Sequence, residues 1–202
     1  MGLERLVVGE LETNCYILES AGEAVIIDPG AAEERLLEAL GGHQLRYILL
    51  THGHPDHLGG APLLKRAWRS AALLLHQGDL PLLRWALPGL EPDGFLSEGD
   101  TIAFGEETLG VLHTPGHSPG SLVFGDDERL FVGDLLFWGS IGRTDLPGGS
   151  PSAMERSLRR LLELDGDLSI YPGHGPETTL AQERISNPFL RELQRRWLPE
   201  RS

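Results

Sequence analysis

The stretch "THGHPDHLGG", residues 51–60, places three histidines and an aspartate within six positions. Neutral imidazole is a common metal ligand, and a carboxylate adds a harder oxygen ligand beside it. His52 and His54 are one residue apart, so on an extended segment their side chains point the same way and can reach one ion. Asp56 and His57 follow in a proline-initiated turn, where they can face a second ion. The stretch therefore predicts one half of a two-metal site.

The elements predicted before this stretch are typical of an α/β protein. Apolar and β-branched runs at 14–20 and 24–30 predict a hairpin, and leucines at helical spacing predict a helix over 31–42. A strand over 45–51 then delivers the chain to His52. Ends of strands are where α/β proteins place their ligands, because the following loop is held on a rigid element.

The remaining sequence alternates helices with a central block of strands. Helices are predicted within 57–71, over 79–87 and over 150–166, and strands at 72–76, 101–104, 107–114, 121–125, 129–134 and 168–175. A closing helix within 185–202, begun near the Asn-Pro step at 187–188, is predicted to bury Phe189, Leu190, Leu193 and Trp197. Two apolar sets of strands are enough for a sandwich of sheets covered by helices.

Composition and charge narrow the classes of function. A chain of 202 residues with 40% hydrophobic and 23% charged residues predicts a single folded domain over 1–202. The net charge of -13 disfavours nucleic acid and anionic membranes as partners. Cys15 is the only cysteine, which excludes an intramolecular disulfide and a thiolate-rich zinc site. With no apolar run of signal-peptide or membrane-helix length, we expect a cytoplasmic protein.

Three further candidate ligands follow predicted strands, each next to a glycine. They are His117 in "LHTPGHSPG", Asp134 in "FVGDLLF" and His174 in "YPGHGP". Glycine lets the backbone turn sharply or approach a ligand closely. One such residue alone is usually part of an ordinary turn, but three of them together with the dense first cluster favour a metal site over a purely structural role.

These motifs resemble those of the metallo-β-lactamase superfamily. Its His-x-His-x-Asp-His hallmark is present as "HGHPDH", accompanied by "DPG" at 28–30, "HTPGHS" at 113–118, "GD" at 133–134 and "GHG" at 173–175. The resemblance spans nearly the whole chain. It implies a four-layer αββα sandwich with the metal site at one edge, between the two sheets.

The resemblance also implies which residues bind metal. It assigns His52, His54 and His117 to one ion, Asp56, His57 and His174 to a second, and Asp134 to both. Asp56 and Asp134 would serve catalysis as ligands of these ions. The expected cofactors are two divalent metal ions, for which we expect zinc, although nitrogen and oxygen ligands also accept iron or manganese.

Two longer segments, 133–149 and 172–190, resemble short bacterial glyoxalase II-like hydrolases. The implied reaction is hydrolysis of a small hydroxyacyl thioester, such as S-lactoylglutathione, by a metal-bridged hydroxide. The helical segment with which full-length glyoxalase II holds glutathione has no counterpart in 175–202, so the thiol carrier stays open. Arg143 is the candidate clamp for a substrate carboxylate, and a pair with Asp145 is the structural alternative.

Other activities stay open at this point. Persulfide dioxygenases of the same superfamily have a "GRTD"-like loop, and they would use His52, His117 and Asp134 for a single iron. The complete second set of candidate ligands favours a hydrolase with two ions. True β-lactamases with two zinc ions commonly place a cysteine near the bridging position, which disfavours antibiotic hydrolysis. A non-enzymatic binding module is a further alternative. The acyl group and the oligomeric state are not predicted.

Overall fold

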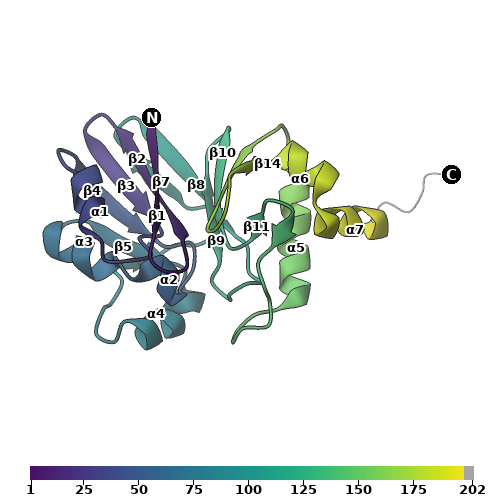
Figure 1. The fold of residues 1–202 in the computed structure, drawn as a ribbon, viewed down its shortest axis with the longest axis horizontal. Helices are drawn as coiled ribbons and strands as arrows, with labels where there is room; N and C mark the ends of the chain where they lie inside the picture. Colours follow the sequence, from purple (N-terminus) through teal and green to yellow (C-terminus); the bar gives the residue numbers. More distant parts are fainter. Residues whose placement is uncertain (198–202) are drawn as a thin grey trace.

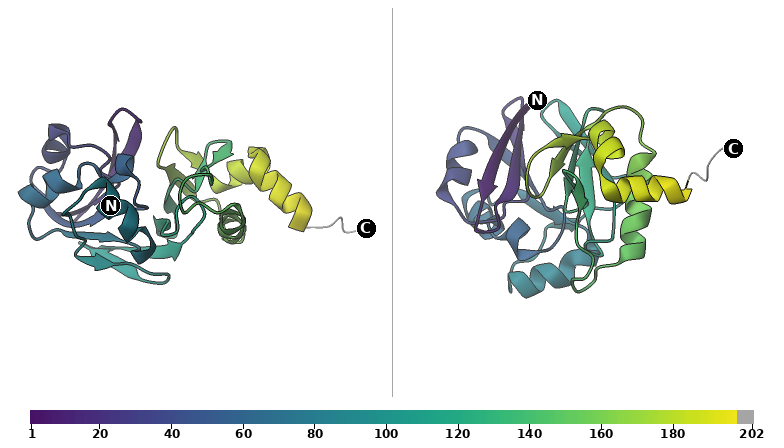
Figure 2. Two further views of the ribbon diagram at one scale, coloured as in Figure 1. Left: turned by 90° about the horizontal axis from the view of Figure 1, so that it is seen from below. Right: turned by 45° about the vertical axis from the view of Figure 1, so that its right-hand side comes forward.

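Two six-stranded sheets pack face to face in the computed structural model, which describes residues 1–197 apart from the side chain of Trp197. Helices cover the outer face of each sheet (Figure 1). The order of layers is helix, sheet, sheet, helix, and the view from below separates the two halves (Figure 2). This arrangement confirms the predicted αββα sandwich.

The first sheet contains the predicted hairpin at its beginning. Its strands follow chain order: β1 (Gly2–Val8), β2 (Thr13–Ser20), β3 (Glu23–Ile27), β4 (Gln44–Leu49), β5 (Ala72–Leu75) and β6 (Gly94–Phe95). The pairs from β1 to β3 are antiparallel, and those from β3 to β6 are parallel. The strands β3 and β4 are covered on both faces, which explains their nearly continuous apolar sequences. Helices between the strands are α1 (Glu34–Ala39), α2 (Pro55–Leu58), α3 (Ala61–Ala67), η1 (Gln77–Asp79) and α4 (Leu80–Ala86).

The second sheet is mostly antiparallel and has the order β14-β13-β10-β9-β8-β7. Its strands are β7 (Thr101–Phe104), β8 (Glu107–His113), β9 (Leu122–Gly125), β10 (Arg129–Gly133), β13 (Ser169–Pro172) and β14 (Thr178–Thr179). The pair of β10 and β13 is parallel, and α5 (Pro151–Leu162) lies between them in the chain. A small hairpin of β11 (Leu136–Phe137) and β12 (Ser140–Ile141) follows β10, while α6 (Leu180–Ser186) and α7 (Pro188–Trp197) follow β14.

Three apolar layers separate the four layers of backbone. Ile26 and Ile48 of the first sheet pack against Leu36 of α1 and Leu64 of α3. Between the sheets, side chains such as Val25 and Phe124 meet. Strands β9 and β10 pack against α5 and α7 through residues that include Val123, Val132, Met154, Leu158 and Leu190. Because each sheet has two covered faces, its strand ends are held rigidly where the loops begin.

The predicted helices differ from the structure mainly at their ends. The helix expected over 31–42 is confined to Glu34–Ala39, and the one expected over 150–166 ends at Leu162. The predicted closing helix is present as α7 and begins at the Asn-Pro step, because the proline at 188 disfavours a helical conformation of Asn187, whose ψ is 118°. Leu190 and Leu193 are buried as predicted.

The prediction that Phe189 is buried on the apolar face of the closing helix is wrong. Phe189, in the first turn of α7, is 45% exposed, because it lines a surface pocket beside Met154 and Leu193. The side chain of Trp197 and the predicted end of the helix over 198–202 lie outside the described residues.

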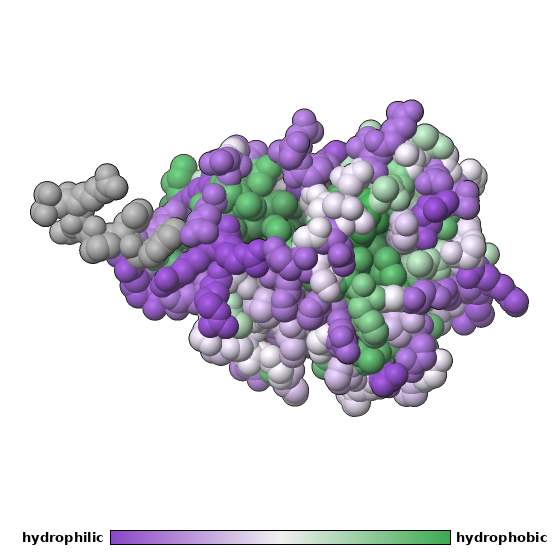
Figure 3. All heavy atoms as spheres, turned by 180° about the vertical axis from the view of Figure 1, so that it is seen from behind, coloured by the Kyte–Doolittle hydropathy of each residue, from purple (hydrophilic) through white to green (hydrophobic). Residues whose placement is uncertain are grey.

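The surface is hydrophilic over much of the face that Figure 3 shows. This face lies opposite to that of Figure 1, and smaller hydrophobic areas lie between its hydrophilic side chains (Figure 3). Among the helices of residues 1–197, none combines the length and the apolar character that crossing a membrane requires.

Candidate metal centre

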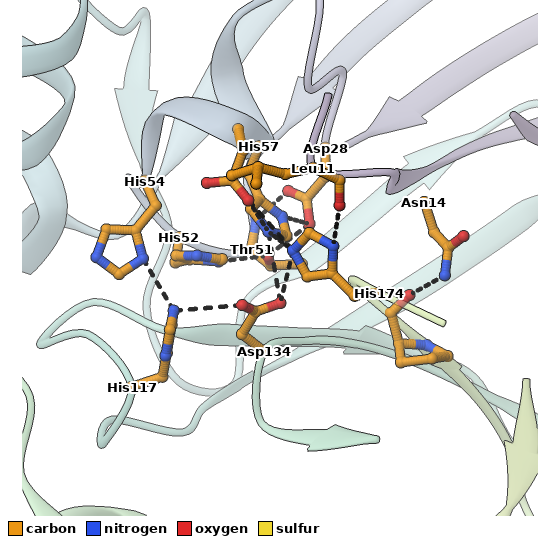
Figure 4. Close-up of polar contacts among 12 residues, drawn as sticks. Leu11, Asn14, Asp28, Thr51, His52, His54, His57, His117, Asp134 and His174 are labelled. Atoms are coloured by element: carbon orange, nitrogen blue, oxygen red, sulfur yellow. Dashed lines mark hydrogen bonds and ion pairs between the residues drawn. The ribbon is translucent and has the colours of Figure 1, made fainter. Parts of the chain in front are cut away.

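The predicted ligands meet at one edge of the sandwich, between the two sheets (Figure 4). The first cluster follows the carboxyl end of β4 and continues into α2. His117 follows β8, Asp134 follows β10 and His174 follows β13. Each residue therefore comes directly or shortly after a strand that is buried in the sandwich, which fixes the position of its backbone.

Three groups of donor atoms form around this cluster: one combines Asp28 with His52 and His57, and the other two consist of predicted ligands alone. His52, His54 and His117 offer ring nitrogens that all lie within 4.8 Å of one another, and we call them the first donor set. Asp56, His57 and His174 form the second donor set by the same measure. His54 Nδ1 lies 2.9 Å from His117 Nε2. In the second donor set, His174 Nε2 lies 3.2 Å from Asp56 Oδ2.

Asp134 lies between the two donor sets. Its Oδ2 is 3.4 Å from Nε2 of His117. Its Oδ1 is 3.4 Å from Nε2 of His57. One carboxylate oxygen thus faces each donor set, and the structure brings all seven predicted ligands together.

The hydrogen bonds of His52 fix its tautomer. Thr51 donates its only hydroxyl hydrogen to Asp28 Oδ2 at 2.6 Å, so the hydroxyl oxygen accepts from Nδ1 of His52 at 3.1 Å. Nε2 of His52 then carries a lone pair. This atom is buried and has no hydrogen-bond partner among residues 1–197, as is also true of Oδ1 of Asp134. Burial lowers the pKa of His52 well below its usual value, with a smaller effect of the charge of His57 in the same direction.

Three other histidines are oriented in the same way. Nδ1 of His117 donates to the main-chain oxygen of Arg143 at 2.8 Å. Nδ1 of His174 donates to the main-chain oxygen of Leu11 at 3.0 Å. Nδ1 of His57 donates to Asp28 Oδ2 at 2.9 Å. In each of these histidines the hydrogen bond at Nδ1 leaves Nε2 facing the centre of the cluster. A hydrogen bond of this kind usually orients a histidine that binds metal.

Two buried aspartates support the cluster, and neither was predicted as a site residue. Asp28 accepts bonds from the main chain and hydroxyl of Thr51 as well as from His57. Asp79 accepts from the main-chain nitrogens of Gly53 and Gly120 at 2.8 and 2.6 Å. Asp79 also accepts from the hydroxyl of Ser118 at 2.6 Å. In the sequence, "DPG" contributed only to the resemblance, and Asp79 before Leu80 and Pro81 reads as an ordinary residue at a helix start.

The charges of the cluster suit cations. Burial raises the pKa of Asp56, but the hydrogen bond from His174 and the charge of His57 outweigh it and hold that pKa at about 2. Burial lowers the pKa of His57, but the negative charges of Asp28 and Asp134 outweigh it and raise that pKa. Ionised carboxylates thus surround the imidazoles, and cations would balance them. The buried acceptor atoms without partners and this charge both fit divalent metal ions.

A cleft of about 550 Å³ opens beside the donor sets. His54, Asp56, His117 and Asp134 line it on one side. Arg143 also lines it, but its guanidinium bonds Asp145 twice, at 2.7 and 2.8 Å. The structural alternative predicted for Arg143 is therefore present, and a clamp on a substrate carboxylate stays a prediction that requires this pair to open.

Comparison with known proteins places the chain among metallo-hydrolases. Residues 8–174 match the model of the metallo-beta-lactamase superfamily. A hydroxyacylglutathione hydrolase, GloC, of Haemophilus influenzae is 38% identical, over 94% of this chain and 98% of the relative.

Solved structures resemble the fold along the whole chain. The B3 metallo-beta-lactamase BLEG-1 has a TM-score of 0.85 at 36% identity, over 94% of this chain and 99% of its own. The di-iron-bound form of TTHA1623 has a TM-score of 0.85 at 42% identity, over 93% and 100%. ETHE1 of Myxococcus xanthus has a TM-score of 0.81 at 28% identity, over 99% and 93%.

Proposed function

Since the chain belongs to the metallo-β-lactamase superfamily, we propose that it is a metal-dependent hydrolase that cleaves hydroxyacyl thioesters, as glyoxalase II does. The observation that carries the proposal is the pair of donor sets with Asp134 between them. The name of the relative from Haemophilus influenzae supports thioesters as the substrate class.

His52, His54 and His117 would hold the first ion, Asp56, His57 and His174 would hold the second, and Asp134 would contribute to both. We expect zinc, and the di-iron form of TTHA1623 makes iron a second candidate. Two divalent ions held there would lower the pKa of a water molecule towards ~7 and polarise the carbonyl oxygen of the substrate.

Neighbouring residues of the chain orient the metal-binding histidine His57 and keep the carboxylate of Asp56 ionised. Asp56, with a pKa of about 2, is a carboxylate at neutral pH and so serves as a ligand rather than as a proton donor. Asp28 holds His57 through its Nδ1. Hydrolysis breaks the C–S bond of the thioester, and water supplies a hydroxyl group to the acyl carbon. The thiol that leaves has a pKa of ~8.5, so it departs as a thiolate without a dedicated acid.

Oxygen chemistry with a persulfide is the second candidate, because ETHE1 of Myxococcus xanthus is similar over 99% of this chain. That activity would use one iron, held by His52, His117 and Asp134. Lactam hydrolysis is a comparison reaction, given the similarity to BLEG-1. The absence of a cysteine near position 134 was taken to disfavour antibiotic hydrolysis. The similarity of this chain to BLEG-1, a metallo-beta-lactamase, weakens that argument, because this chain has an aspartate at 134.

One set of measurements separates these activities. Protein purified without chelator is analysed for metal content and assayed for hydrolysis of S-lactoylglutathione, for oxygen uptake with glutathione persulfide and for hydrolysis of a chromogenic lactam. We expect two metal ions per chain and thioester hydrolysis. One iron per chain with oxygen uptake and no thioester hydrolysis would overturn the proposal.

A further inference from the structure

We infer that the cleft beside the metal centre binds an apolar thiol carrier, an alkyl or aryl thiol, in preference to glutathione. The inference rests on the proposed thioester hydrolysis and names the part of the substrate that the sequence left open.

Much of the rest of the lining of the cleft is apolar. Leu11, Leu82, Trp85 and Leu146 line it. Leu11 is 66% exposed and Trp85 is 73% exposed, although most large apolar side chains of the described residues are buried. Two strongly exposed apolar side chains at the mouth of one cleft are typical of a surface that a ligand covers.

The backbone that carries each of the two exposed side chains is held in place near the metal centre. Leu11 lies in the turn between β1 and β2, and its main-chain oxygen accepts the hydrogen bond from His174. Trp85 lies on α4, whose Leu83 is fully buried in the core beneath the helix. A wall that is ordered before binding loses little conformational entropy when a ligand arrives.

Charge in the cleft argues against glutathione. The carboxylates of glutathione outnumber its ammonium group, so its recognition requires cationic partners. Among the described residues that line the cleft, Arg143 is the one lysine or arginine, and Asp145 already holds its guanidinium. The net charge of -13 adds a repulsive field around the protein, which the two proposed divalent ions offset only in part. An uncharged apolar thiol avoids both effects and gains from burial against Leu11 and Trp85.

The test compares lactoyl thioesters of three thiols that share the acyl group: glutathione, N-acetylcysteamine and phenylethanethiol. We expect kcat/KM for the phenylethanethiol ester to exceed that for the glutathione ester by about tenfold or more. In the variants Leu11→Ser and Trp85→Ser this ratio should fall by about tenfold each. The matched control is Ile185→Ser, an exposed apolar residue on α6 that does not line the cleft, in which the ratio should stay unchanged.

A binding measurement tests the cleft without turnover. Alkanethiols of increasing chain length are titrated into the metal-loaded protein by calorimetry, and affinity should rise by up to about fourfold for each buried methylene. The rise should be smaller in Trp85→Ser.

The outcomes for the function and for the carrier are distinct. Absence of hydrolysis for all three esters would overturn the proposed function, while the titration still tests the cleft. Hydrolysis with preference for the glutathione ester, or an affinity that does not change with chain length, would overturn the apolar carrier and leave the function standing.

Discussion

Asp79 is a single buried carboxylate that connects two loops of the metal centre. It bonds Gly53, which lies between His52 and His54, and it bonds Ser118 and Gly120, which follow His117. In Asp79→Asn one side-chain oxygen becomes an NH2 group, which would face a main-chain N–H. We expect metal affinity to fall by about 10- to 100-fold and the free energy of unfolding to fall by about 2 kcal/mol. Metal titration and denaturant unfolding measure the two effects.

The control for this variant is Asp100→Asn. Asp100 is exposed, accepts a hydrogen bond from the main-chain nitrogen of Ser97 and does not bond the loops that carry the donor sets. It should leave metal affinity unchanged. Equal metal affinity of Asp79→Asn and the natural protein would contradict the proposed connection of the loops.

At Gly173 the backbone passes close to two proposed ligands. A Cβ atom at this position would lie 2.4 Å from Oδ1 of Asp134 and 2.6 Å from Cε1 of His57. Gly173→Ala must therefore displace a proposed bridging ligand, and we expect loss of at least one metal ion per chain by elemental analysis. Gly110→Ala is the control, since its nearest contact is an ordinary 3.7 Å to Gly125. Full metal content in Gly173→Ala would show that the ligands tolerate the shift.

At the scale of single residues, the seven proposed metal ligands were predictable from the sequence. Their types and their place after strands are visible as local patterns. The supporting role of Asp79 was not predictable, because its bonds reach Gly53 and Gly120, which are distant in the chain. No local pattern encodes such a contact.

Helix α5 holds the loop that carries His117. The main-chain nitrogen of Ser150, its N-cap residue, donates to the oxygen of Gly116 at 2.8 Å. The buried hydroxyl of Ser157 donates to the oxygen of Pro115 at 2.8 Å. Ser157→Ala removes the second bond and leaves a carbonyl without its partner. We expect about 1 kcal/mol lower stability and a several-fold lower metal affinity, measured by unfolding and by metal titration.

The matched control on the same helix is Ser152→Ala, since Ser152 is exposed and does not contact the loop. Both variants replace serine by alanine within α5, so they change the helix propensity by nearly the same amount. If the two behave alike in metal titration, α5 does not position His117 through Ser157.

At the scale of elements, prediction succeeded where apolar patterns are strong. The strands β2 to β5 and β7 to β10 have such patterns and were all expected. Strand β1 was missed because only Val8 is buried in it, so its sequence has no apolar run. Helix α7 was expected from the Asn-Pro step, whereas α6 was not expected, because its seven residues, 180–186, are too few for a clear helical pattern.

The whole molecule explains why the metal centre should stabilise the fold. Each donor set combines side chains that follow the first sheet with side chains that follow the second: His52 and His54 with His117, and Asp56 and His57 with His174. A bound ion would therefore link the two halves of the sandwich. The same groups without cations leave carboxylates and partnerless acceptor atoms buried at the interface.

Removal of metal should accordingly lower the unfolding temperature of the whole protein. A ligand present at a hundredfold excess over its Kd adds about 2.7 kcal/mol, which corresponds to about 5 to 10 °C for a domain of this size. Calorimetry before and after chelation, and again after adding metal back, measures the shift. In Asp56→Asn, which weakens only the second donor set, the shift should be smaller but present. An unchanged unfolding temperature after chelation, in protein shown to have lost its metal, would mean that the ions do not link the two sheets.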